Sequence, residues 1–381
     1  MKHKWRKGLL AVACASVSAL GLGTVAGSAS AAKVASPGVT RAAVPGNTSS
    51  GVFSKTEHQA AARYWTPSRM AAAKPISIGV KAGQRAGAGT VDRALVGTPS
   101  AVPPAGRGAT ATGTPAAGSL GRPTTLVAAA YAYPAPFTRY ALFPNSQYNV
   151  YPNRAHGKLF FTQHVHLNPT VDQNFVCSGT VVSSVGRWLV ETAGHCVANA
   201  TTHTFSFNVK FVPAYRSGTA PFGSWTAFSL WTKTAWINTG NLREDRGFVL
   251  LNKNSAGQQI QNVTGSEGIA FNQGYLQHVV DFGYPAASPF NGETEQLCLA
   301  SFEETDPFNA SAGSVPWGIG CDQTGGSSGG GWVIRYGPGG GFVNGHNDYK
   351  YTSPSRPLEM FSPYFDNSEL SLYNCATDNV C

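Results

Sequence analysis

Charged residues are scarce in this chain, at 12% of 381 residues, and no apolar run of about 18 residues follows position 31. The low charge argues against coiled coils and helical repeats, and the missing apolar runs exclude a membrane-spanning helix beyond that position. Turn-forming and aromatic residues are abundant, with 44 glycines, 24 prolines, 8 tryptophans and 14 tyrosines. This composition favours a turn-rich β protein of one large or two small domains.

Acidic residues are nearly absent from residues 1–135, which hold 15 Lys and Arg but only 2 Asp and Glu, a net charge of +13. Residues 136–381 hold 13 basic and 17 acidic residues, a net charge of −4. The positive charge of the whole chain therefore belongs to its leader. Because the remainder lacks the clustered Lys and Arg that bind phosphates, we exclude DNA or RNA as the main partner.

Residues 1–31 have the three parts of a secretory signal peptide. Residues 1–7 are basic, residues 8–27 are apolar, and residues 29–31 form a small-residue cleavage site, Ala-Ser-Ala. Cys14 offers a lipoprotein anchor as the alternative, but it lies too close to the basic start for that motif. We therefore expect a secreted, extracellular protein that has no membrane attachment after signal removal.

Aromatic residues are missing from residues 66–130, and Ala, Gly, Pro and Thr dominate residues 84–121. Such a segment cannot bury enough apolar surface to offset its ordering entropy, so we expect disorder there. Just before it, the aromatic patch around Trp65 could dock on another surface. We interpret residues 32–140 as a pro-segment whose end falls between residues 121 and 156. A flexible stalk or cell-wall linker is the alternative that the same composition would serve.

Signal removal leaves an even number of cysteines, all within the last 205 residues, which in an exported chain predicts three disulfides. From His156 onward, short β-type runs alternate with Gly, Pro, Asn and Ser, and long segments of helical period are missing. This pattern favours an all-β barrel or sandwich.

Two short motifs contain residues suited to nucleophilic catalysis. Residues 192–196 read Thr-Ala-Gly-His-Cys, and the imidazole of His195 could act as a general base at a cleft edge. The glycine-rich residues 324–332 contain Ser328, a nucleophile that substrate could approach, and the N–H groups of Gly326 and Ser328 could hold an oxyanion. The structural alternative for the first motif is a surface histidine that lies beside a disulfide. For the second motif it is a plain Gly/Ser loop.

An acidic residue opens the buried apolar strand expected at residues 247–251. At that position Asp245 could accept a hydrogen bond from Nδ1 of His195, which fixes the tautomer and stabilises the imidazolium. Glu244 beside it and Asp281 further on are competing acids. The motif alone is weak, and its place between the histidine and serine motifs supports it.

The serine motif also matches G-x-S-x-G, the nucleophile elbow of α/β-hydrolases, at residues 326–330. That fold places the acid and the histidine after the serine. Here the only histidine after Ser328 is His346, 18 residues on, and βα alternation is missing. Chain order therefore disfavours an esterase or lipase of that class.

The three motifs together resemble those of trypsin- and chymotrypsin-like serine peptidases, specifically the secreted bacterial branch that includes glutamyl endopeptidases. The similarity covers roughly residues 155–350, and the patch Trp65-Thr66-Pro67 resembles pro-segments in that branch. It implies an all-β peptidase domain over residues 141–381, built as two six-stranded antiparallel Greek-key barrels at about residues 155–255 and 256–381.

The resemblance also assigns roles to particular side chains. It implies His195, Asp245 and Ser328 as the catalytic residues, with Gly326 and Ser328 as the oxyanion hole. It pairs Cys177 with Cys196, while proximity in sequence pairs Cys298 with Cys321 and Cys375 with Cys381. Fifteen pairings are open in principle.

Two features of the animal enzymes are absent. Ser327 precedes the nucleophile where those enzymes carry Asp, and residues 120–160 contain nothing like their Ile-Val-Gly-Gly amino terminus. In those enzymes the aspartate pairs with the new terminal amine. The absence of both the aspartate and this amino terminus implies that maturation releases a blocking pro-segment and does not form a buried ion pair.

Two residues compete as determinants of substrate preference. Asp322 lies six residues before Ser328, where trypsin-like members bind Lys or Arg, although Cys321 lies seven residues before the serine and the family's cysteine four. His346 follows Gly345 as in the strand where glutamate-specific members place a histidine facing an acidic side chain. A broad or apolar pocket is the third alternative.

We predict a secreted serine endopeptidase made as a prepro-protein. Its partners are protein or peptide substrates and its own pro-segment, as inhibitor or folding aid. We expect a monomer without metal or organic cofactor. A catalytically inactive exported binding protein on the same scaffold and an esterase are the alternatives, because a fold alone does not establish activity.

Overall fold

The computed structural model describes residues 39–44, 48–81, 97–108, 116–117, 133–306, 313–353 and 355–381. The signal peptide expected over residues 1–31 lies outside them, as do parts of the expected pro-segment. In the part of the chain that the structure describes, no helix is long and apolar enough to cross a membrane.

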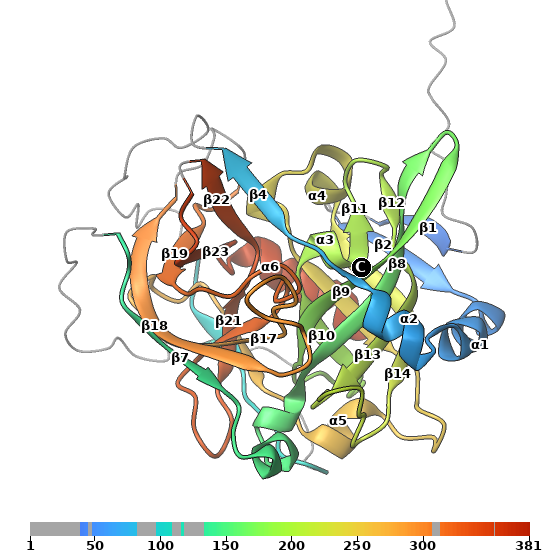
Figure 1. The fold of residues 1–381 in the computed structure, drawn as a ribbon, viewed down its shortest axis with the longest axis horizontal. Helices are drawn as coiled ribbons and strands as arrows, with labels where there is room; N and C mark the ends of the chain where they lie inside the picture. Colours follow the sequence, from blue (N-terminus) through green and yellow to red (C-terminus); the bar gives the residue numbers. More distant parts are fainter. Residues whose placement is uncertain are drawn as a thin grey trace, which may run out of the picture. The chain divides into compact units, whose positions relative to one another are not determined.

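Six antiparallel strands close into a barrel in the order β8, β9, β10, β15, β14 and β13, which returns to β8 (Figure 1). Their alternating Val, Leu, Phe and Trp side chains fill the interior, for example Leu159, Val190 and Val249, all fully buried. The strands are β8 (His156–Leu167), β9 (Thr170–Val181), β10 (Leu189–Thr192), β13 (Phe207–Pro213), β14 (Trp225–Lys233) and β15 (Gly247–Leu251).

A second sheet follows in sequence and curls without closing. Its order is β22, β23, β19, β18, β17, β20, β21 and β16, and the last pair is parallel. The expected second closed barrel is therefore an open, curled sheet. The strands are β16 (Gly268–Phe271), β17 (His278–Gly283), β18 (Gln296–Thr305), β19 (Trp317–Gly320), β20 (Gly331–Ile334), β21 (Phe342–His346), β22 (Tyr349–Ser353) and β23 (Glu359–Ser362).

Strands of the leader occupy the two ends of this open sheet. β4 (Ile78–Lys81) pairs with β22, and β5 (Ser100–Val102) pairs with β16 and with β6 (Ala116–Ala117). Each leader strand supplies the hydrogen bonds that an edge strand would otherwise lack. β7 (Phe137–Ala141), which follows the leader, pairs with β18.

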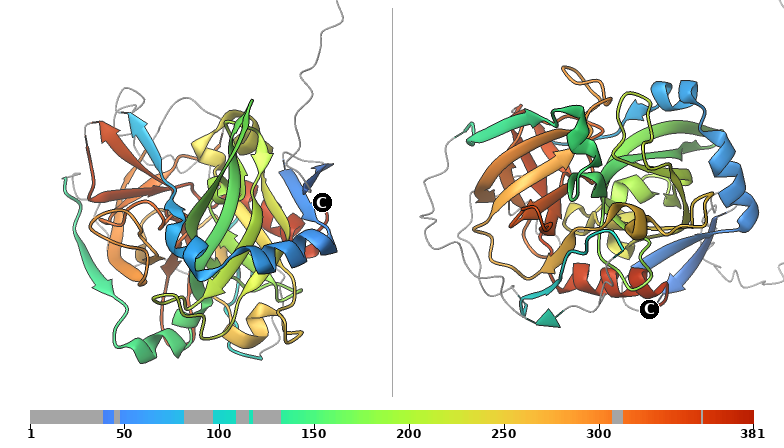
Figure 2. Two further views of the ribbon diagram at one scale, coloured as in Figure 1. Left: turned by 45° about the vertical axis from the view of Figure 1, so that its right-hand side comes forward. Right: turned by 90° about the horizontal axis from the view of Figure 1, so that it is seen from below.

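The expectation of disorder is therefore wrong for residues 97–108, and the leader is also ordered over residues 48–81. There β2 (Thr48–Phe53) pairs with β1 (Val39–Val44) and β14, and α1 (Lys55–Tyr64), α2 (Pro67–Ala72) and β3 (Lys74–Pro75) follow. A capping box of Ser54 and Glu57 begins α1. The composition argument failed because these segments need no core of their own: β2, α1 and α2 pack on the outside of the first barrel (Figure 2), and β5 pairs with β16 of the second sheet.

Short helices and turns connect the strands: α3 (Gly194–Val197), α4 (Thr234–Thr239), α5 (Ile260–Thr264), the 3-10 turns η3 (Asn145–Asn149), η4 (Asn153–Ala155) and η5 (Leu242–Glu244), and the hairpin of β11 (Ala198–Asn199) and β12 (Thr204–Phe205). The last helix, α6 (Asn367–Asp378), begins at the N-cap Asp366, whose carboxylate accepts from Ser368 N and Glu369 N. Its buried face, with Leu372 and Tyr373, packs in a cluster with residues of β15 and β16.

Candidate active site

A short helix after β10 holds His195 against Asp245. The backbone N–H of His195 donates to Asp245 Oδ1 at 2.6 Å, and Nδ1 lies 2.9 Å from Oδ2. Gly194 permits this approach, because a Cβ there would lie 2.7 Å from Asp245 Oδ1. Asp245 is fully buried and carries no exposed surface. The structure thus brings together the histidine and the acid expected from the sequence.

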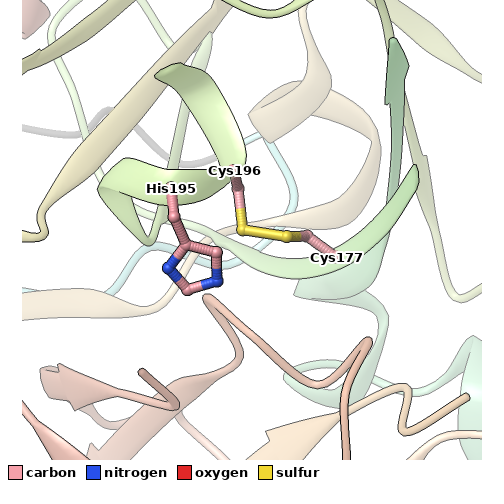
Figure 3. A group of neighbouring side chains, drawn as sticks. All are labelled: Cys177, His195 and Cys196. Atoms are coloured by element: carbon pink, nitrogen blue, oxygen red, sulfur yellow. A yellow bond between two sulfur atoms is a disulfide. The ribbon is translucent and has the colours of Figure 1, made fainter. Parts of the chain in front are cut away.

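A disulfide fixes the same helix to the barrel. Cys196 is bonded to Cys177 of β9, with a Cα–Cα distance of 6.2 Å, beside the His195 ring in Figure 3. Gln163 Nε2 adds a hydrogen bond of 2.9 Å to the carbonyl oxygen of His195. The ring therefore has one defined orientation. The other disulfides, Cys298–Cys321 and Cys375–Cys381, are also the pairs expected from the sequence.

The competing acids serve other partners. Asp281 in β17 accepts from Asn347 Nδ2 at 2.7 Å and from Gln323 Nε2 at 3.2 Å, and its burial raises the pKa well above the usual range. Glu244 accepts from Ser368 Oγ at 2.7 Å. In the described structure the acid beside Nδ1 of His195 is therefore Asp245, with one further carboxylate, Asp348, at 3.5 Å.

Ser328 lies in a glycine loop tied to the strands that lead to His195. Its carbonyl oxygen accepts from Ser178 N at 2.7 Å, and Ser178 Oγ donates to Gly326 O at 3.0 Å. Gly326 has φ +96°, a conformation that favours glycine. At Gly329, φ is +75° and a Cβ would lie 2.0 Å from Thr192 Oγ1. The backbone conformation and close packing thus require glycine at positions 326 and 329, whereas a plain Gly/Ser linker would not need glycine at fixed positions.

The adjacent serine is occupied elsewhere. Ser327 Oγ donates to Thr324 O at 2.9 Å, within its own loop. Ser328 lines the same pocket as Asp348, which lies 3.5 Å from His195 Nδ1. Nε2 of His195 has no hydrogen-bond partner among the described residues. Ser328 and Asp348 thus line one pocket, and Asp348 also lies beside the His195 ring.

A segment of the leader occupies this site. Gly326 N donates to the carbonyl oxygen of Ile76 at 2.9 Å, and Ser328 Oγ approaches the same oxygen at 3.4 Å. On one side β3 pairs with β9, and on the other β4 pairs with β22, so residues 74–81 run from one sheet to the other (Figure 1). His195 and Ser328 are buried, at 2% and 4% exposed.

A pocket of about 290 Å³ adjoins Ser328. Leader residues form one wall and strand β22 another; the lining residues are Ser77, Ile78, Gly79, Thr324, Gly325, Ser327, Ser328, Asp348, Tyr349, Lys350, Tyr351, Thr352, Ser355, Pro357 and Met360. Neither of the two expected specificity residues, Asp322 and His346, lines this pocket.

Asp322 and His346 are engaged in other contacts. Asp322 Oδ2 forms an ion pair of 2.7 Å with Arg139. His346 is fully buried: its Nδ1 lies 2.6 Å from Glu191 Oε1, and its Nε2 lies 3.1 Å from Asp245 O. His346 therefore supports Asp245 from behind, and burial lowers its pKa to about 4.

Lys350 lines the pocket where those residues were expected, and no sequence motif identified it. Its Nζ donates to Pro357 O at 2.7 Å and to Cys321 O at 3.0 Å. Burial lowers the pKa of Lys350 to about 8, against the opposing charges of Asp322 and Asp281. The pocket therefore combines one cation with the aromatic rings of Tyr349 and Tyr351.

The described part of the chain contains three groups of His, Cys, Asp or Glu side chains compact enough to bind a metal ion. Two of them rest on disulfide cysteines, whose sulfurs are bonded to each other and are not available as ligands. The third is the cluster of His195, Asp245 and Asp348. The observed hydrogen bonds of this third cluster suit proton transfer.

The arrangement of a closed β-barrel, a curled second sheet and a His–Asp pair beside a glycine-flanked serine defines the trypsin-like class of β-barrel proteins. Among solved structures, a thermostable serine protease AL20 from an extremophilic microorganism is 37% identical, with TM-score 0.53, over 59% of this chain and 98% of that chain. The protease Anisep from Arthrobacter nicotinovorans is 39% identical, with TM-score 0.51, over 60% of this chain and 97% of that chain.

The structure of a Glu endopeptidase in complex with MPD is 17% identical, with TM-score 0.47, over 63% of this chain and 96% of that chain. No family model and no curated protein sequence matches the chain. The chain belongs to the bacterial trypsin-like serine proteases, and the resemblance seen in its motifs is confirmed.

Proposed function

We propose that the protein is a secreted serine endopeptidase in which His195, Asp245 and Ser328 form the catalytic triad. The observation that carries this proposal is the pair of contacts to Asp245: the backbone N–H and Nδ1 of His195 both reach its carboxylate. This geometry fixes the tautomer in which Nε2 can accept a proton. The glycine loop carries Ser328 on the pocket that Asp348 also lines, and Asp348 lies 3.5 Å from His195 Nδ1, which supports Ser328 as the nucleophile.

The chemistry then follows from the positions of these groups. Ser328 Oγ attacks the scissile carbonyl carbon and transfers its proton to His195 Nε2. The negative charge that develops on the carbonyl oxygen is held by the N–H groups of Gly326 and Ser328. His195 returns the proton to the leaving amine, which gives an acyl-enzyme. Water, deprotonated by His195, hydrolyses the acyl-enzyme and restores Ser328.

The contact made by the leader supports the role of Gly326. Its N–H already holds a peptide carbonyl oxygen, that of Ile76, at 2.9 Å. The same donor could therefore hold a substrate oxyanion once the leader has left. The backbone edges of β9 and β22 that pair with leader strands would then pair with an extended substrate peptide.

Residues 32 to about 140 would act as a pro-segment that blocks the site. Ser328 and His195 are covered while Ile76 lies between the two sheets, so the unprocessed chain would be latent. The three disulfides indicate folding in an oxidising compartment, which supports secretion of the protein. Release of the leader would then activate the enzyme outside the cell.

Labelling with a fluorophosphonate probe tests the catalytic assignment. We expect the processed protein to react with one equivalent of probe at Ser328, to cleave casein, and to turn over short-chain esters less efficiently than peptides. An unlabelled, stably folded processed protein would favour a binding protein on this scaffold. Ester turnover without casein cleavage would favour an esterase.

A further inference from the structure

A second carboxylate lies beside the His195–Asp245 pair. Asp348 follows β21 at the start of β22, where its backbone N–H donates to Phe361 O at 3.0 Å. Its Oδ1 lies 3.5 Å from His195 Nδ1, and the ligand atoms of His195, Asp245 and Asp348 all lie within 4.8 Å of one another. The side chain of Asp348 is fully buried, and neither carboxylate oxygen has a hydrogen-bond partner among the described residues.

Two carboxylates and one imidazole share one buried site, so their protonation states are coupled. Asp245 accepts two hydrogen bonds from His195, at 2.6 and 2.9 Å, which stabilise its ionised form. Asp348 has only the longer contact from His195 Nδ1, at 3.5 Å, and burial followed by the charge of Asp245 raises its pKa well above the usual range. Asp348 is therefore the carboxyl group that holds a proton.

Among the described residues, the cation that pairs with Asp348 is His195, at 3.5 Å; Lys350, which lines the same pocket, donates to Cys321 O and Pro357 O. His346 of β21 is buried and bonded to Glu191 of β10, and burial raises the pKa of Glu191. Burial also raises the pKa of Glu369 on α6, to about 8. Arg246, the buried cation nearby, is paired with Asp366 at 2.6 Å. The remaining neighbour, Tyr349, has its hydroxyl bonded to Asp306.

The protonation of Asp348 decides whether His195 can work. Burial alone would lower the pKa of His195, but Asp245 and Asp348 together raise it to about 10. An imidazole held protonated by two carboxylates cannot accept a proton from Ser328. A neutral Asp348 removes half of that negative charge and leaves Nε2 free as a base.

We propose that Asp348 is a positioning residue of the active site: a neutral carboxylic acid that donates its O–H toward Asp245 and leaves Asp245 as the ionised partner of His195. This role rests on the proposed peptidase function. The hydrogen bond would satisfy an otherwise orphaned buried oxygen and keep the Asp245 carboxylate oriented toward Nδ1. The cluster then carries one negative charge in the resting enzyme and titrates as a unit.

Titration of His195 by ring ¹⁵N NMR tests the proposal without using activity. The full chain carrying Ser328→Ala, which prevents self-processing, is compared with the same chain carrying Asp348→Asn in addition. Asparagine mimics the neutral acid and can donate to Asp245. We expect the pKa of His195 to change by less than about 0.5 unit, because the replaced group was already neutral. A fall of more than about one unit would show that Asp348 is ionised and would overturn the proposal.

Two further variants guard against misfolding and a purely structural effect. Asp348→Ser keeps a hydroxyl donor and is titrated in the same way should the asparagine variant unfold, with the same two outcomes.

In the processed enzyme, Asp348→Ala should lower kcat about tenfold or more with KM unchanged, and Asp348→Ser or Asp348→Asn should restore most of it. Equal losses in all three would also overturn the role. Asp378→Asn, on the exposed face of α6, is the matched control. Failure of the wild-type enzyme to cleave peptides would reject the proposed function, while the NMR titration would still decide the state of Asp348.

Discussion

The two adjacent serines of the glycine loop differ in what their hydroxyls contact. Ser327 Oγ donates to Thr324 O at 2.9 Å, whereas the partner of Ser328 Oγ among the described residues is the carbonyl oxygen of Ile76, at 3.4 Å. Removal of the leader would leave the hydroxyl of Ser328 free for His195 and that of Ser327 still bonded. The loop therefore distinguishes one serine as nucleophile and the other as part of its support.

Substituting these serines in turn should give very unequal effects. We expect Ser328→Ala to lower kcat/KM for casein-derived peptides by about 10⁴- to 10⁶-fold and to abolish probe labelling, because triad members act as a unit. Ser327→Ala should cost less than about tenfold, since it loses a hydrogen bond within the loop. Comparable losses at both positions, with both variants folded, would reject the assignment of Ser328.

Local sequence could predict some residues of the site and not others. His195, Asp245 and Ser328 lie in short motifs flanked by glycines and a cysteine, so local sequence predicts them as site residues. Asp348 and Lys350 reach the site because the curled sheet brings β22 there, and no local pattern marks them. Asp322 and His346 were expected in the pocket from spacing, but their side chains pair with Arg139 and Glu191.

At the scale of elements, the last helix is attached to the site through a buried ion pair. Arg246 follows Asp245 directly, and its guanidinium lies 2.6 Å from Asp366, the N-cap of α6. Both side chains are buried, so removing either partner leaves an uncompensated charge. The position of α6 and that of the His–Asp pair are thus mechanically linked.

Acid should weaken this attachment. Burial alone would raise the pKa of Asp366, but the charge of Arg246 and hydrogen bonds from Ser314 and Arg246 lower it to about 2. Because the folded pKa lies below the unfolded one, the stabilisation is complete above about pH 4 and is lost as the pH falls toward 2. We expect Asp366→Asn to lower the free energy of unfolding by about 3–5 kcal/mol at neutral pH and to flatten its decline between pH 4 and 2.

Denaturant unfolding of the two proteins across that pH range measures the difference. Asp378→Asn, on the exposed end of the same helix, should leave both the stability and its pH dependence unchanged. If the free energies of unfolding of wild type and Asp366→Asn fall in parallel as the pH is lowered, the ion pair does not contribute to acid sensitivity.

The ordered leader depends on one aromatic anchor. Trp65 is 5% exposed, lies against Phe160 of β8 with ring centroids 5.5 Å apart, and donates through Nε1 to Asn208 O. The sequence predicted a docking surface at this patch but not the strands on either side of it. Those strands could not be predicted because their partners, β14 and β22, lie far away in the chain.

Removing this anchor should weaken inhibition by the leader. Truncating a buried tryptophan costs about 3–5 kcal/mol, so a leader peptide carrying Trp65→Ala should inhibit the processed enzyme more than about 100-fold less tightly than the wild-type leader. Lys55→Ala, at an exposed position of α1, is the control. Equal inhibition constants for the two leader peptides would show that Trp65 does not hold the leader in place.

At the scale of the whole molecule, charge divides the chain at the point where the leader ends. The leader is strongly basic and the remainder has a net charge of −4. The leader also contributes strands to both ends of the second sheet and a carbonyl to the site. Its removal would therefore change the charge, the sheet edges and the access to Ser328 in one step.

The structure narrows where that cut should fall. The sequence alone allowed residues 121–156, but residues 137–141 pair along their whole length with β18, and the turns η3 and η4 that follow bury Tyr148 and Ala155. A segment packed into the fold in this way is a poor protease substrate. We therefore expect the mature amino terminus between residues 122 and 137, measured by intact mass and amino-terminal sequencing. Any cut between Arg122 and Arg139 leaves the same net side-chain charge of −4, so the active form should focus at acidic pH. Activity should rise in step with the appearance of this acidic species. An active enzyme that begins at residue 32, with residues 74–81 still attached, would refute the pro-segment, because those residues would then have to leave the cleft without being cut away.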